Sequence, residues 1–96
     1  METLWLQCKV LPGMFSHELL VVISDPDRGE LASILVDDSI VRITETPTAD
    51  RAVDGFLRVD AVAKGGRMNV MLPVASAEVG SIVSVPPELL APQEAR

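Results

Sequence analysis

A chain of 96 residues with 48% hydrophobic and 23% charged residues has the composition of one globular domain rather than of a disordered segment. Its formal net charge is −6, and tryptophan and phenylalanine together supply its few aromatic side chains. An acidic chain without a basic run lacks the cations that neutralise nucleic-acid phosphates or hold an anionic membrane. We therefore expect no nucleic-acid partner and no membrane partner.

The cysteine content and the first residues bear on the cellular compartment. Cys8 is the only cysteine, so the chain cannot form an internal disulfide. No apolar run approaches the length of a membrane span, and the first residues lack a basic segment followed by an apolar core. These features predict a cytoplasmic protein, and the compact chain favours a prokaryotic one.

Residues 3–11 alternate between two faces, as expected of a half-buried strand. Pro12 and Gly13 should end this strand. The loop that follows carries two large apolar side chains, Met14 and Phe15. They either pack under the core or are exposed for contact with a partner. The residues expected to face inward from the strand are Leu4, Leu6, Cys8 and Val10.

Residues 18–38 read as two apolar strands joined by a turn at residues 25–29. Pro26 presets one turn dihedral and Gly29 accepts a positive one, so this segment predicts a β-hairpin. Both faces of its strands are apolar, although a sheet that faces water on one side should be polar there. Both faces of this hairpin therefore need cover.

The middle of the chain predicts a further strand at residues 39–44 and then a short helical insert or ordered loop. The insert is suggested by Thr46 as an N-cap, Pro47 at the first helical position and Gly55 as a stop. Gly65 and Gly66 predict a two-residue hairpin turn. The remaining elements that we expect are strands at 56–64, 68–74 and 81–85, a small helical lid at 88–90 and a frayed tail at 91–96.

About seven short strands at regular spacing predict a mainly β domain over residues 1–90. A small antiparallel barrel of the SH3-like or OB-like kind, with one short helical insert, suits this length. The alternative is a β-sandwich.

The usual catalytic side chains are scarce. His17 is the only histidine, and its neighbours Ser16 and Glu18 do not make a triad, because triad members converge from separate elements. Cys8 on an inward face should be an unreactive buried thiol. The acidic turn at residues 25–30 lacks the length of a calcium loop. We therefore predict no catalytic residue, no metal site and no cofactor, and an enzyme only through carboxylates such as Asp37, Asp38, Asp54 and Asp60.

The surplus of apolar residues on both strand faces is the main functional signal. We predict a non-catalytic β-barrel interaction or binding module that self-associates as a homo-oligomer, most simply a twofold dimer, with a further protein partner also allowed. The alternative is a small acidic ligand-binding or carboxylate-dependent enzyme domain acting on a cationic small molecule. The candidate interface residues are Trp5, Met14, Phe15, Met68 and Met71.

Overall fold

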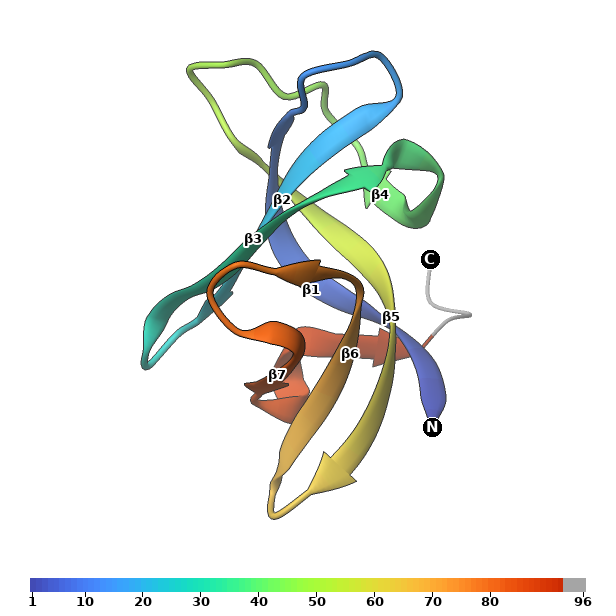
Figure 1. The fold of residues 1–96 in the computed structure, drawn as a ribbon, viewed down its shortest axis with the longest axis vertical. Helices are drawn as coiled ribbons and strands as arrows, with labels where there is room; N and C mark the ends of the chain where they lie inside the picture. The colour runs from blue at the N-terminus through green and yellow to red at the C-terminus, as the bar shows by residue number, and fades with distance from the viewer. Residues whose placement is uncertain (93–96) are drawn as a thin grey trace.

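The computed structural model describes residues 1–92, and Figure 1 shows a strongly twisted antiparallel sheet that curls into a nearly closed barrel. Two single turns of 3-10 helix, η1 and η2, interrupt the strands in this part of the chain. The elements are β1 (Glu2–Pro12), β2 (Glu18–Asp25), β3 (Gly29–Asp37), η1 (Asp38–Ile40), β4 (Val41–Ile43), β5 (Val53–Lys64), β6 (Arg67–Ser76), β7 (Gly80–Val85), η2 (Pro87–Leu89) and β8 (Leu90–Pro92).

The sheet is organised around two long strands, β1 and β5, which pair with each other along most of their length. The strand order is β3-β2-β1-β5-β6-β7, and the short strands β4 and β8 pair with β5 and β1 respectively. The other edge of each long strand pairs with two strands. β1 pairs with β8 near its start and with β2 near its end, and β5 pairs with β4 near its start and with β6 near its end. A long strand twists, so its two ends face different directions and can meet different neighbours.

The predicted inward face of β1 is confirmed, because Leu6 and Val10 are fully buried and Leu4 and Cys8 nearly so. On β5 buried and exposed residues alternate cleanly from Val53 to Ala61, and Leu57, Val59 and Ala61 all enter the core. The period-2 pattern of each strand therefore places its side chains correctly.

The barrel prediction is confirmed, with one more strand than we expected in residues 1–92 and with the helical insert replaced by a loop. Residues 46–52 form an ordered loop in which Thr48 and Arg51 exchange backbone hydrogen bonds of 3.1 Å in each direction. Gly55 does not end a helix, since it lies inside β5. A Cβ there would stand 2.8 Å from the side chains of Ile43 and Val10, so only glycine fits where three strands converge.

The C-terminal part of the described chain differs partly from our expectation. The lid at residues 88–90 is the 3-10 turn η2 and the first residue of β8. Ala91 and Pro92, which we placed in a frayed tail, pair in register with Trp5 and Leu4. Near its start, the edge of β1 that faces away from β5 has no other strand partner. Its backbone N–H and C=O groups can therefore pair with this short segment. Residues 93–96 of the predicted tail lie outside the described residues.

Side chains close the barrel where the sheet path ends. Asp25, at the end of β2, is almost completely buried and accepts a 2.6 Å hydrogen bond from Nη2 of Arg67 on β6. Arg67 also donates from Nε to Oγ of Ser84 on β7, at 2.8 Å. We call these three residues the seam network. It joins the β2–β3 hairpin to the β6–β7 hairpin.

Candidate interaction surfaces

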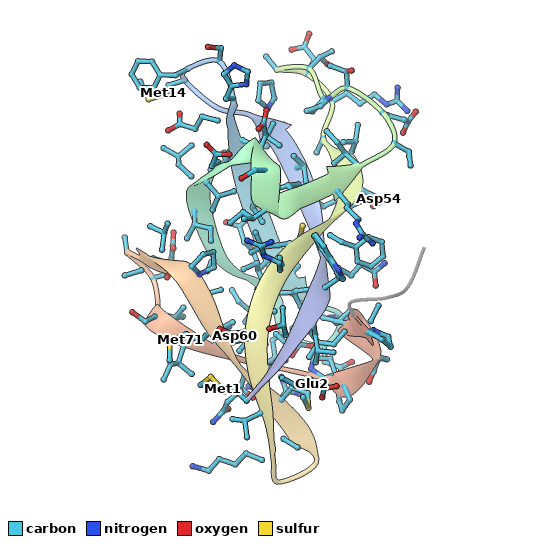
Figure 2. The ribbon with its side chains drawn as sticks, turned by 90° about the vertical axis from the view of Figure 1, so that its right-hand side faces the viewer. Met1, Glu2, Met14, Asp54, Asp60 and Met71 are labelled. Carbon is cyan, nitrogen blue, oxygen red and sulfur yellow. The ribbon has the colours of Figure 1, made fainter. Side chains whose placement is uncertain are left out.

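The five residues predicted for an interface do not form one surface. Trp5 is only 7% exposed, and the guanidinium carbon of Arg42 lies 4.2 Å from its ring centroid. Met68 packs against the core. Figure 2 shows Met14 at one end of the molecule and Met71 well away from it, below the middle of the view. The structure thus separates the candidates into two buried or half-buried residues and two distant surfaces.

The first surface lies on the outer face of β1, β2 and β3. Leu11 pairs in register with Leu20, and Leu20 with Leu35, so three leucines form one row across three strands. The neighbouring residues on these strands point into the core, which places the leucines outside. Leu35 is 40% exposed, and the other two are partly exposed. An outward row of leucines is the opposite of what a solvated sheet face should carry.

The loop between β1 and β2 continues this surface at the end of the strands. Met14 is 79% exposed and Phe15 is 71% exposed, so the loop is not tucked under the core. Its backbone is nevertheless ordered, since Gly13 N–H donates to the carbonyl of Glu18 at 3.0 Å and Met14 N–H donates to Glu18 Oε1 at 2.9 Å. We call the leucine row and this loop, residues 13–17, the loop end of the molecule.

Acidic side chains border the loop end. Glu18 and Asp37 stand directly opposite each other on β2 and β3, an arrangement of like charges that normally destabilises a sheet. Backbone N–H groups hold each carboxylate in place, and the 2.8 Å hydrogen bond from Ser39 N–H keeps the pKa of Asp37 below its usual value. Asp38 adds a third acid, 3.5 Å from Nδ1 of His17.

The second surface lies on the outer face of β5, β6 and β7. Met71 stands between Asp60 and Ile82 in register, and Ile82 is 52% exposed. A hollow of about 260 Å³ opens beside Met71, with Ile40, Leu72 and Pro73 among its apolar lining. We call this hollow, with Met71 and Ile82, the groove end.

Charged side chains of both signs lie at the groove end. Arg58 lines the hollow, and Lys64 lies on the same outer face of β5, four residues beyond Asp60. Both cations are exposed. Asp60 also lines the hollow, but its carboxylate accepts a 2.9 Å hydrogen bond from the Thr3 hydroxyl. The rim of this end is therefore more basic than the rim of the loop end.

Another recess, of about 420 Å³, lies on the outer side of β1 and β5 between β4 and β8. Its lining is mostly apolar and includes Trp5, Ile43, Phe56 and Ala91. The cation of Arg42 already lies against the ring of Trp5. This recess resembles a binding groove in shape, but it does not bring carboxylates together.

The residues considered for catalysis remain apart or unreactive. Burial raises the pKa of the Cys8 thiol to about 12, with a further contribution from the nearby charge of Asp54, so it is not a nucleophile near neutral pH. Asp54 pairs with Lys9, and Figure 2 shows it well separated from Asp60. Within residues 1–92, no three His, Cys, Asp or Glu side chains are grouped to hold a metal ion. That the protein lacks catalysis, metal and cofactor stays a prediction.

Three arginines, Arg42, Arg51 and Arg67, contact different groups on the barrel and do not form one phosphate-binding face. Arg67 belongs to the seam network, Arg51 binds the carboxylate of Glu45 at 3.3 Å, and Arg42 lies over Trp5. The exclusion of nucleic acid also stays a prediction. No helix in the part of the chain that is described is long and apolar enough to span a membrane.

Sequence reasoning missed the seam network. The sequence suggested only a turn for Asp25 and gave no role to Ser84. No local signal could have revealed the contact, because Asp25 and Arg67 are 42 residues apart.

Neither a scan against protein-family models nor searches of curated proteins and of solved structures found a match for this chain.

Proposed function

We propose that this protein is a non-catalytic interaction module that self-associates through its loop end. The supporting observation is the outward row of Leu11, Leu20 and Leu35, continued by the exposed side chains of Met14 and Phe15. Burying such a surface against another chain removes apolar area from water, which is the main favourable term in most protein association.

The composition of the loop end supports this proposal. Aromatic and methionine side chains are enriched at interface cores, and a polar rim usually surrounds them. Here Phe15 and Met14 would be the anchors, and Glu18, Asp37 and Asp38 would form part of the rim. The loop is held by its own backbone hydrogen bonds, so little conformational entropy would be lost when it binds.

The alternative, a ligand-binding or enzyme domain for a cationic small molecule, has less support. Such a site needs convergent carboxylates. Asp25 and Asp54 both line a recess of about 310 Å³, but each already binds a cationic side chain, Arg67 and Lys9 respectively. Asp37 and Asp60 bind other groups on the barrel. The recess beside Trp5 carries the guanidinium group of Arg42, which disfavours a cation.

Light scattering on a size-exclusion column, over a wide range of protein concentrations, tests the proposal. We expect the parent to exceed the mass of one chain. Leu35→Glu and Phe15→Asp should each weaken association about tenfold or more, because a charge would be buried without a partner. Val79→Glu is the matched control, since Val79 is a similarly exposed aliphatic residue outside the loop end. A parent that stays monomeric at every concentration contradicts the proposal.

A further inference from the structure

The barrel consists of two equivalent halves. Each half contains a long strand, a hairpin, a single 3-10 turn and a short strand: β1 to β4 with η1 in the first half, and β5 to β8 with η2 in the second. The short strand of each half pairs with the long strand of the other half. Leu6 and Leu57 are equivalent, fully buried and paired with each other. Each half is therefore an internal control for the other, because a feature found in one half alone is not required by the fold.

The leucine row of the first half has a direct counterpart in the second half. Val62 pairs in register with Asn69, and Asn69 with Ser84, which repeats the register of the leucine row with two polar residues in place of leucines. The residues beside both rows are buried and aliphatic, namely Val10, Val21 and Ile34 in the first half and Ala61, Val70 and Val83 in the second. The loop of residues 13–17 likewise corresponds to a two-residue glycine turn between β5 and β6. The barrel therefore does not need the loop end for its own core.

Two acids lie between the two parts of the loop end. Glu18 and Asp37 are each two residues along their strand from a leucine of the row, Leu20 or Leu35. They therefore point to the same outer face, about 7 Å from the row. The loop of residues 13–17 begins on their other side. No lysine or arginine occurs at residues 10–27 or 29–41, so the strands that build this surface place acids at its centre without a lysine or arginine.

This placement has a consequence for a twofold contact. Such a contact brings the same surface of two copies together, with the symmetry axis through its centre. If both the leucine row and the loop are buried, the centre lies near Glu18 and Asp37. The carboxylates of the two copies then meet within roughly one Debye length, which is about 10 Å at 0.1 M salt. Like charges that face each other across an interface oppose association.

We propose that two copies of the chain join loop end to loop end about a twofold axis, and that their own central acids oppose this contact, so that ionic strength controls assembly. The inference rests on the proposed self-association and adds its arrangement and its regulation. Burial of the leucines, Met14 and Phe15 drives the contact, whereas Glu18 and Asp37 make it weak at low salt and strong at high salt.

Sedimentation equilibrium of the full chain at a series of sodium chloride concentrations tests this proposal. Between about 0.02 M and about 0.5 M salt, the dissociation constant of the dimer should fall about tenfold or more. The double variant Glu18→Gln with Asp37→Asn removes two charges but keeps side-chain oxygens that can accept from the N–H groups of Met14 and Ser39. We expect it to associate about tenfold more tightly than the parent at low salt.

The double variant should also lose most of the salt dependence. The dependence that is left measures how salt strengthens apolar burial. The matched control is Asp60→Asn with Glu88→Gln, which changes the net charge equally but lies in the second half. This control should associate like the parent at every salt concentration.

Other outcomes overturn the inference and separate it from the proposed function. Association that salt weakens, or a double variant that associates like the parent, shows that these acids do not face each other; the twofold arrangement is then wrong, and self-association stands if Phe15→Asp still dissociates the parent. Equal tightening in the control shows a general effect of net charge and also overturns the inference. A parent that is monomeric at every protein and salt concentration removes both proposals. Circular dichroism verifies that the variants fold, and Glu18→Gln alone, with an expected tightening of about threefold, replaces the double variant if that does not.

Discussion

Asp25 and Asp54 each accept a short hydrogen bond from a cationic side chain of another strand, yet the two pairs occupy opposite environments. Asp25 is buried and binds Arg67 at 2.6 Å, whereas Asp54 is mostly exposed and binds Lys9 at 2.5 Å. Water competes fully for the exposed pair, so its net contribution to stability is small. A buried carboxylate that loses its partner stays desolvated and uncompensated. Burial, rather than distance, decides which pair matters.

The positions of the two pairs sharpen this difference. Lys9 and Asp54 stand opposite each other on β1 and β5, which already share a long backbone ladder. Asp25 and Arg67 belong to β2 and β6, which are the second strands from the two ends of the sheet path, β3 and β7. The exposed pair therefore duplicates a connection made by the backbone, while the buried pair supplies a connection across the seam.

The largest effect should come from Arg67→Ala. Removing the guanidinium leaves Asp25 buried without its cation and also frees the hydroxyl of Ser84. We expect the melting temperature to fall by roughly 10 °C or more. Calorimetry or circular dichroism measures the shift, and Arg51→Ala, which removes an arginine from an exposed pair with Glu45, is the matched control. A shift no larger than that of the control would show that the seam does not depend on this pair.

The pH dependence of stability tests the role of the buried carboxylate of Asp25. The hydrogen bond from Arg67, supported by the backbone N–H of Asp27, lowers the pKa of Asp25. A lowered pKa means that its stabilising contribution is complete above the unfolded-state pKa of about 3.9 and is lost as the pH falls through the lower folded-state value.

Urea denaturation at a series of pH values from neutral to strongly acidic measures this loss. Asp25→Asn should be less stable than the parent at neutral pH and should show a shallower decline in acid. If Asp25→Asn declines as steeply as the parent below pH 4, the acid sensitivity comes from other groups, among which Asp37 also has a lowered pKa.

The smallest effect should come from Lys9→Ala. Its pair with Asp54 is exposed on both sides, so the free energy of unfolding should change by no more than about 0.5 kcal/mol. Urea denaturation at low and at high salt measures it, and salt should reduce even this small difference. A loss of stability comparable to that of Arg67→Ala would show that the exposed pair contributes as much as the buried pair.

The loop end and the groove end show which surface features could be predicted from the sequence. The sequence predicts that the loop with Met14 and Phe15 either packs under the core or is exposed to a partner, and the structure shows that it is exposed. The groove end was only partly anticipated, through Met71. Its hollow arises because β4 and β6 meet the same edge of β5 at different positions, with Ile40 and Pro73 brought beside Arg58 from distant parts of the chain.

The sequence alone determined the strands other than β8, their inward faces and the two tight hairpin turns. These features depend on alternation along a strand and on the dihedral freedom of residues such as Gly29 and Gly66, both of which are local. Only the tertiary structure decided that residues 46–52 form a loop, that Gly55 lies where three strands converge, and that Asp25 meets Arg67. Each of these depends on which strands become neighbours and in what register, and that is settled by closure of the whole barrel rather than by any one segment.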